Sequence, residues 1–212
     1  RCCPPEISHM VYLSPDGKHL LTANIKSENI SVINRESGTL ETLIPAGKGV
    51  EGMAFTPDGK YLWALNQTGG NITVINWLSR TVVAEFECPG MPVRIKFSTD
   101  GSRAYVVGWE KNGTLTVIDV KSRKEIKRIP VGNFALGIET SPDGKYAFVG
   151  CEDAGKTSIG KDGEENLEKI KSKSDGVHVI DLDKLEVVKV VETGLGPDPM
   201  KMWWPPNKLI EN

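Results

Sequence analysis

One short phrase recurs along the chain at nearly constant spacing. It reads Ser/Thr-Pro-Asp-Gly, and its third copy keeps only the serine, the aspartate and the glycine. Successive copies start 42, 42 and 43 residues apart, at Ser14, Thr56, Ser98 and Ser141. A tandem period of this size indicates a repeat architecture, in which every unit packs against its neighbours.

Each unit has the pattern of four short strands. In the second unit, runs rich in β-branched and aromatic residues cover 50–55, 60–66, 71–77 and 81–90, and Gly, Pro, Asn and Asp separate them. The Pro-Asp-Gly phrase predicts a tight turn between the first two strands: proline presets φ, aspartate bonds its own backbone and glycine accepts positive φ. No unit has a sustained helical period, so the sequence predicts an all-β fold.

Four-stranded antiparallel units of this length are typical of β-propeller blades. The predicted blades cover about 7–48, 49–90, 91–132 and 133–194, and a partial fifth blade covers 196–212. Because one blade cannot bury both of its faces, blades stack around an axis. We therefore expect a single propeller domain that is part of a larger ring. The alternative is a four-bladed ring closed by an overlapping strand.

Several segments resemble the YVTN-type β-propeller repeat. They are SPDGKYAFVG at 141–150, VHVIDLDKLEVVKVVETG at 177–194, and TLTVIDVKSRKEIKRIPVG at 114–132. In these segments a turn, a third strand and a closing Gly follow one another as in that family. The resemblance implies a ring of about seven blades and a secreted, periplasmic or cell-surface location.

The composition limits the classes of partner. With a formal net charge of −2 and 25% charged residues, the chain lacks the excess of positive charge that grips nucleic acid or anionic lipid. No apolar run approaches the roughly 20 residues of a membrane-spanning helix. The four cysteines show neither CxxC nor zinc-like spacing, so we expect no metal site.

Propeller geometry predicts where a ligand would bind. The first-to-second and third-to-fourth turns share one end of the blades, and the remaining connections share the other end, where propeller ligands usually bind. The Pro-Asp-Gly turns are therefore interpreted as structural. At the ligand end, the connection 151–175 is far longer than its counterparts, and long loops on rigid scaffolds often carry function. The alternative for this segment is a solvated insertion.

The first strand of each blade borders the axis. We expect one series of its side chains, including Val11, Leu13, Met53 and Phe55, to face the core, and small residues such as Gly52 and Gly137 to permit close approach. The opposite series would line the channel, where Arg94, Lys96 and Lys201 could attract an anion unless Glu139 neutralises them. The predicted ligand or partner face consists of His9, Arg94, Lys96, Trp109, Glu110, Glu139, Cys151, Glu152, Lys201 and Trp203.

No catalytic constellation is legible in the sequence. The histidines His9, His19 and His178 form no zinc-like group and no Ser-His-Asp order. The leading interpretation is therefore a non-catalytic extracytoplasmic module for binding or assembly. Its partner would be another protein chain or an anionic small ligand at the channel mouth, and its cofactor is unassigned.

Two alternatives come from other classes of protein. In the first, the chain is the propeller subunit of a periplasmic oxidoreductase complex, similar to quinoprotein amine dehydrogenases, nitrite reductases or hydrazine-forming complexes. In the second, it is an enzyme similar to propeller lactonases or lyases, which would rely on Glu51, Glu139 and His9 near the channel. Fold analogy alone does not decide between them.

Overall fold

The computed structural model describes residues 6–152 and 176–193, and these form strands and turns without a helix. The strands make four antiparallel sheets of four, each in sequence order from its first strand to its last. The prediction of an all-β propeller built of four-stranded blades is thus confirmed. Within the described residues, no helix has the length and apolar character needed to cross a membrane.

The first two sheets come from the N-terminal half of the chain. Blade 1 consists of β1 (Ser8–Leu13), β2 (His19–Asn24), β3 (Asn29–Asn34) and β4 (Leu40–Pro45). Blade 2 consists of β5 (Val50–Phe55), β6 (Tyr61–Asn66), β7 (Asn71–Asn76) and β8 (Thr81–Glu87).

The other two sheets follow in the same order. Blade 3 consists of β9 (Pro92–Phe97), β10 (Arg103–Gly108), β11 (Thr114–Asp119) and β12 (Lys124–Pro130). Blade 4 consists of β13 (Ala135–Thr140), β14 (Tyr146–Cys151), β15 (Gly176–Asp181) and β16 (Glu186–Val191).

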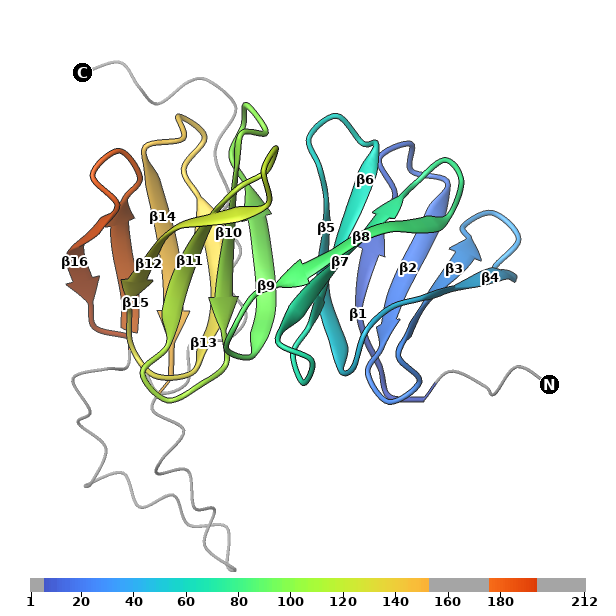
Figure 1. The fold of residues 1–212 in the computed structure, drawn as a ribbon, viewed down its shortest axis with the longest axis horizontal. Coiled ribbons are helices and arrows are strands. Elements are labelled where there is room, and N and C mark those ends of the chain that lie inside the picture. Colours follow the sequence, from blue (N-terminus) through green and yellow to red (C-terminus); the bar gives the residue numbers. More distant parts are fainter. Residues whose placement is uncertain (1–5, 153–175, 194–212) are drawn as a thin grey trace, which may run out of the picture.

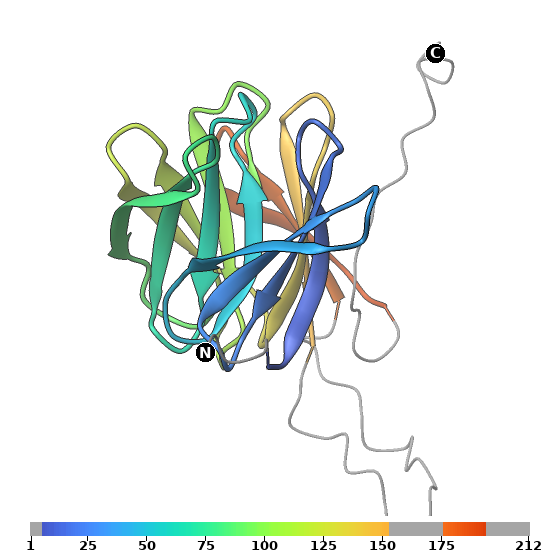
Figure 2. The same ribbon diagram turned by 90° about the vertical axis from the view of Figure 1, so that its right-hand side faces the viewer.

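The four blades follow one another along the longest axis of the molecule, from blade 1 in blue to blade 4 in orange and red (Figure 1). The inner strands run nearly vertically in this view and in the view turned by 90° (Figure 2). The outermost strands β4, β8 and β12 are strongly slanted against them, as the twist within each sheet requires.

The repeated phrase forms the same hydrogen-bonded turn in every blade. In blade 1 the Ser14 hydroxyl donates to Asp16 Oδ1 at 2.6 Å, and the Lys18 N–H donates to the same oxygen at 3.1 Å. Gly17 takes φ +71° and its N–H donates to the Ser14 carbonyl at 2.9 Å. Bonds to the ionised carboxylate lower the pKa of the turn aspartates Asp16, Asp58, Asp100 and Asp143, that of Asp100 to about 2.

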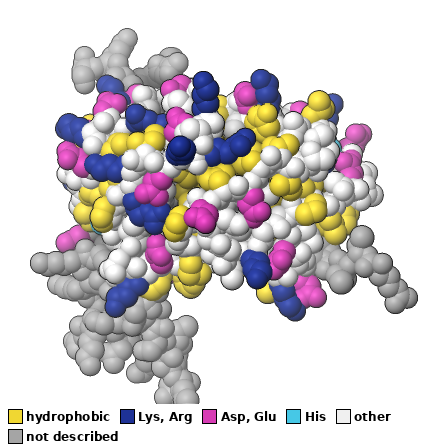
Figure 3. All heavy atoms as spheres, in the orientation of Figure 1, with side chains coloured by type: hydrophobic (Ala, Val, Ile, Leu, Met, Phe, Trp, Pro, Cys, Tyr) yellow, Lys and Arg dark blue, Asp and Glu magenta, His cyan; other side chains and the backbone are white. Residues whose placement is uncertain are grey.

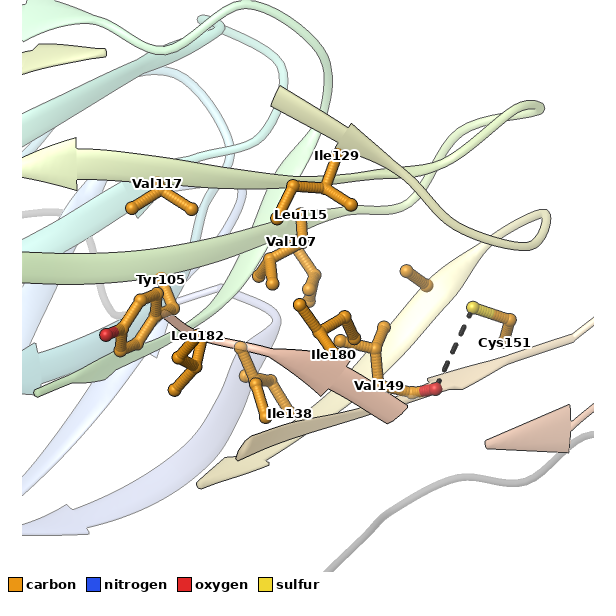
Figure 4. Packing of buried hydrophobic residues seen from close by; sticks show 12 residues of the cluster. Tyr105, Val107, Leu115, Val117, Ile129, Ile138, Val149, Cys151, Ile180 and Leu182 are labelled. Carbon is orange, nitrogen blue, oxygen red and sulfur yellow. Dashed lines mark hydrogen bonds between the residues drawn. The ribbon is translucent and has the colours of Figure 1, made fainter. Parts of the chain in front are cut away.

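Three apolar clusters hold the blades together, one at each junction between neighbouring blades. Figure 4 shows the junction of blades 3 and 4, where Tyr105, Leu115 and Val117 of blade 3 face Ile138 and Ile180 of blade 4. These side chains are at most 5% exposed. Burial between sheets, rather than within one sheet, is what stabilises the repeat.

The expectation that Val11 and Leu13 face the core is wrong. Their side chains are 65% and 51% exposed, whereas Met53, which occupies the position of Val11 in blade 2, is 2% exposed. The reason is that blade 1 covers Met53, while no described segment covers the corresponding face of blade 1. The position of a residue in the repeat therefore predicts which face of the blade its side chain lies on. Whether that side chain is buried depends on whether a neighbouring blade packs on that face.

Candidate functional site

The four first strands, β1, β5, β9 and β13, lie next to one another in chain order and form the innermost part of the stack. The pairing of each with its second strand is interrupted by a register shift near its beginning. In blade 2 the irregularity includes Gly52, where an added Cβ would lie 2.0 Å from the Val93 carbonyl oxygen. The predicted close approach at Gly52 is thus confirmed.

These inner strands line a partly open cavity of about 510 Å³. Arg94, Lys96 and Glu139, which the sequence places in the channel series, all line it, together with Tyr12 and several apolar side chains. The cavity also reaches Pro15 and Thr56, which belong to the turns at the end away from the predicted ligand face. Its lining therefore comes from the middle of the inner strands and from the ends that lead into these turns.

The two cations of this cavity each pair with a carboxylate. Arg94 Nη1 lies 2.7 Å from Glu51 Oε1, and the two side chains are only 14% and 10% exposed. Lys96 Nζ lies 2.9 Å from Glu139 Oε2, with side chains 40% and 19% exposed. Of the predicted positive lining, the two described cations, Arg94 and Lys96, are therefore neutralised by neighbouring carboxylates.

Two further polar side chains lie beside these pairs. His9 Nδ1 is 3.8 Å from Glu51 Oε1, beyond hydrogen-bonding distance, and is buried without a hydrogen-bond partner. The Tyr12 oxygen accepts the Met53 N–H at 3.3 Å. Burial raises the pKa of Tyr12, although this N–H and the charge of Arg94 oppose the rise, so the phenol stays protonated at neutral pH.

A second group of predicted residues lies where the second strands of blades 3 and 4 end. Trp109, 36% exposed, packs against Phe134 with 5.5 Å between ring centroids. Its indole N–H points to Glu152 Oε1 at 3.5 Å. The Glu110 carbonyl accepts the Phe134 N–H at 2.9 Å. We call Trp109, Glu110, Phe134 and Glu152 the rim cluster.

The remaining predicted site residues have different surroundings. Cys151 is fully buried in the apolar cluster between blades 3 and 4, where Figure 4 shows it beside Val149. Lys201, Trp203 and residues 153–175 of the long connection lie outside the described residues.

Sequence reasoning overlooked the partners of these residues. Glu51 was considered only as a catalytic acid, and Tyr12 and Phe134 were not singled out as site residues. A signal existed for Tyr12, because it is an aromatic residue at a position held by Ala54, Lys96 and Glu139 in the other three described blades. The pairing of Glu51 with Arg94 joins consecutive blades, which no local pattern predicts.

The face of the molecule seen in Figure 3 carries charged side chains of both signs. Figure 3 shows Lys and Arg side chains interspersed with Asp and Glu, and hydrophobic side chains between them. Among the described residues, no group of three or more His, Cys, Asp or Glu side chains could hold a metal ion.

Four radially stacked antiparallel blades with a lined axial cavity define the chain as a β-propeller. The model of the family described as Cytochrome D1 heme domain matches residues 65–193, which is 129 of the 212 residues. The chain belongs to this family.

Among solved structures, the chain resembles a chain of Kuenenia stuttgartiensis Hydrazine Synthase, with a TM-score of 0.74 and 23% sequence identity. The match covers 91% of this chain and 51% of the hydrazine synthase chain, so the protein spans about half the length of that relative. At this identity the likeness establishes the fold alone. Comparison with curated proteins gives no match.

The family name refers to a haem, so the cavity has to be tested as a haem site. Haem iron takes His, Cys, Met or Tyr as a protein ligand. Among the described residues, no histidine or cysteine lines the cavity, and the Tyr12 oxygen is a protonated phenol bonded to the Met53 N–H. Met10 and Met53 line the cavity but lie, like Tyr12, outside the matched range.

The charges of the cavity lead to the same result. Haem carboxylates need cationic partners, and both Arg94 and Lys96 are already paired with carboxylates. A haem entering here would bring its negative groups close to Glu51 and Glu139. The described residues of the cavity therefore do not fit a haem.

Proposed function

We propose that this chain is a propeller module of a periplasmic redox complex, in which it docks protein partners while another part of the complex holds the cofactor. The supporting observation is the match to the Cytochrome D1 heme domain model over 65–193. The family is named for a haem, but the proposal places the cofactor outside this chain. The reason is that Arg94 and Lys96, the two cations of the axial cavity, are neutralised by carboxylates of the same chain.

The rim cluster is the surface to which we assign docking. Trp109 is a partly exposed aromatic side chain held by Phe134 and Glu152, which are contributed by the next blade. Rigid, half-exposed Trp side chains are enriched among the residues that dominate protein interfaces. The likeness to a structure titled hydrazine synthase is compatible with a redox setting, although its identity of 23% supports only the fold.

Two finer assignments belong to this proposal. The repeated turn and third-strand pattern supports a YVTN-type propeller, in which this chain is part of a larger ring. That assignment, together with the family match, supports a location outside the cytoplasm. The residues predicted from the sequence stay candidates for the partner face, with the rim cluster as its centre, except Cys151, whose side chain is fully buried between blades 3 and 4.

The test compares the isolated chain with its native assembly. Size-exclusion chromatography of the native protein, monitored in the Soret region, should show haem absorbance co-eluting with the chain. The purified chain alone, titrated with haemin, should give no stoichiometric Soret change. A native assembly without haem or other redox absorbance would contradict the redox setting. Stoichiometric haemin binding by the isolated chain would contradict a docking role separate from the cofactor.

A variant pair gives this test an internal control. Glu51→Gln with Glu139→Gln releases Arg94 and Lys96 from their carboxylates, so haemin binding should appear or strengthen at least several-fold. The control, Glu125→Gln, removes a carboxylate of the outer strand β12 from its pair with Arg128 and should leave haemin binding unchanged. Equal haemin binding by both variants would show that the charges of the axial cavity do not determine whether haemin binds to the chain.

A further inference from the structure

A partly open groove of about 350 Å³ lies between blades 2 and 3, at the end of the blades that carries the Pro-Asp-Gly turns. Tyr61, Trp63 and Val74 of blade 2 line it, and Val120 and Arg123 of blade 3 line it from the other side. We call it the Val120 groove. Blades 2 and 3 each pack against a described blade on both sides, so the groove belongs to the interior of the stack.

The turn that follows the third strand reaches the preceding blade at every junction. The first residue of this turn donates its N–H to the carbonyl of the residue before the second strand, at 2.8–2.9 Å; it is Trp77 in blade 2, Val120 in blade 3 and Leu182 in blade 4. Three positions further on, the backbone takes a φ of 55–58° at Arg80, Arg123 and Leu185. The three turns therefore have one backbone conformation, and their side chains can be compared directly.

At the junction of blades 1 and 2, the ring of Trp77 fills this place. It makes edge contacts with His19 and Phe55, at 5.6 Å and 5.0 Å between ring centroids. The Arg80 guanidinium lies over the indole, 3.1 Å from its centroid, and donates to the Trp77 carbonyl. The indole is thus held by aromatic edges and by a cation on its face, two arrangements that stabilise an aromatic ring.

At the junction of blades 3 and 4, aliphatic side chains fill the same place. Leu182 is 2% exposed within the apolar cluster of this junction, and Leu185 packs against the cluster. Arg103 of blade 3 donates from Nη1 to the Leu182 carbonyl at 3.0 Å. Two of the three junctions are therefore closed by side chains of the chain itself.

The junction of blades 2 and 3 keeps the cation but lacks the ring. Val120 stands where blade 2 has Trp77, and Arg123 stands where blade 2 has Arg80. Arg80 is half-buried against its indole, whereas Arg123 is exposed. The smaller side chain at position 120 leaves the space that forms the Val120 groove.

The walls of the groove remain aromatic. Tyr61 occupies the position that His19 holds in blade 1. Trp63 is 2% exposed and contacts the ring of Phe97 at 5.2 Å between centroids, so it takes up part of the junction. The volume that is left lies at the lower end of the range of about 300–1,000 Å³ for ligand pockets. This size suits a single aromatic side chain.

The charges around the groove are balanced. Asp58 and Asp100 line it together with Lys121 and Arg123. Both carboxylates already accept hydrogen bonds within their own turns. Two carboxylates and two cations favour neither an anion nor a cation, whereas an uncharged ring flanked by polar peptide groups complements such a surface.

From these observations we infer that the Val120 groove binds a tryptophan side chain presented by a partner protein, with its indole beneath the Arg123 guanidinium as Trp77 lies beneath Arg80. The bound side chain would supply in trans the ring that blade 2 supplies in cis. This inference is independent of the proposed redox function, because the groove lies at the opposite end of the blades from the rim cluster.

Nuclear magnetic resonance of the ¹⁵N-labelled chain, titrated with N-acetyl-L-tryptophanamide, tests the site. We expect saturable shifts of the amides of 120–123 and of the Trp63 indole N–H, and much weaker shifts with N-acetyl-L-leucinamide. Arg123→Ala should weaken the binding about two- to fivefold, the worth of an exposed cation–π contact. The control, Arg35→Ala, removes an exposed guanidinium from blade 1 and should leave the affinity unchanged.

A variant that fills the groove gives a second test. Val120→Trp places the indole in cis, so it should abolish the saturable shifts and raise the Tm. The control, Val190→Trp, adds the same side chain at a 41% exposed position of the outer strand β16 and should leave binding intact. A lower Tm for Val120→Trp than for the wild type, or retained binding, would contradict the inference.

The reverse variant tests the comparison between junctions. Trp77→Val should open an equivalent groove between blades 1 and 2, and added indole should then recover part of the lost Tm. No recovery with indole would show that the two junctions are not equivalent and would count against the site.

Three results with the wild-type chain would overturn the inference. The first is the absence of saturable shifts, and the second is shifts confined to the axial cavity or the rim cluster. The third is binding of free indole without binding of N-acetyl-L-tryptophanamide, which would identify a site for a small aromatic molecule instead of a protein side chain. None of these results bears on the haemin test of the proposed function, so the two can fail separately.

Discussion

Glu51→Gln is the substitution that most directly tests the packing of the axial cavity. It keeps the shape of the side chain but removes the charge that Arg94 faces at 2.7 Å. Leaving one partner of a buried ion pair unpaired costs about 3–5 kcal/mol. The 10% and 14% exposure of the two side chains places this pair at the lower end, about 3 kcal/mol. For a chain of this size that corresponds to a fall in Tm of roughly 6–12 °C.

Thermal unfolding followed by circular dichroism measures this effect, with Glu125→Gln as a matched control. Arg128 and Glu125 are also 2.7 Å apart, but their side chains are 29% and 43% exposed. Loss of a solvent-exposed pair costs at most about 1 kcal/mol. Adding Arg94→Met to Glu51→Gln should recover much of the lost stability, because no buried charge then stays unpaired. Equal shifts for Glu51→Gln and Glu125→Gln would refute the reasoning.

Three further predictions follow from single positions. Gly52→Ala should lower the free energy of unfolding by about 1–3 kcal/mol or more, since its Cβ would meet the Val93 carbonyl; Gly108→Ala, with contacts no closer than 3.4 Å, should cost less in the same urea titration. The pKa of Asp100 is lowered to about 2 in the folded protein, against about 4 in the unfolded chain, so the ionised carboxylate stabilises the fold above pH 4 and this contribution is lost as the pH falls through 2. Asp100→Asn removes the carboxylate and should therefore flatten the loss of Tm between pH 4 and pH 2. An unchanged slope of Tm against pH would contradict this. Burial raises the pKa of Cys88 to about 12, so native protein at pH 8 should leave this thiol unalkylated by iodoacetamide, as peptide mass spectrometry can check against a denatured sample.

The strand pattern was predictable because it is local. The Pro-Asp-Gly turns close within a few residues, and the run Val50–Phe55 read from the sequence is the strand β5 of the structure. Alternation of side chains along a strand also predicted which residues of the first strands face the channel. Arg94, Lys96 and Glu139 belong to this predicted series, and all three line the cavity of the structure.

The candidate site was less predictable because its contacts join different blades. Glu51 reaches Arg94 across 43 positions of sequence, and Trp109 reaches Glu152 across the same separation. Each contact joins a residue to the same or a neighbouring position of the next repeat. The repeat length predicts that these positions recur, but it does not predict which of their side chains come into contact. The exposure of Val11 and Leu13 was mispredicted for a related reason, since burial depends on a neighbouring blade.

The sequence by itself determined the structure of a single blade. It predicted the strands, the turns between them, and the side chains that lie on each of the two faces of the blade. It could do so because turn chemistry and the two-residue alternation of strands act over a few residues. Only the tertiary structure decided that Arg94 and Lys96 are neutralised and that no described segment covers Val11 and Leu13. Both depend on how one blade meets the next, where the distances between side chains follow from packing across the axis rather than from neighbours in the chain.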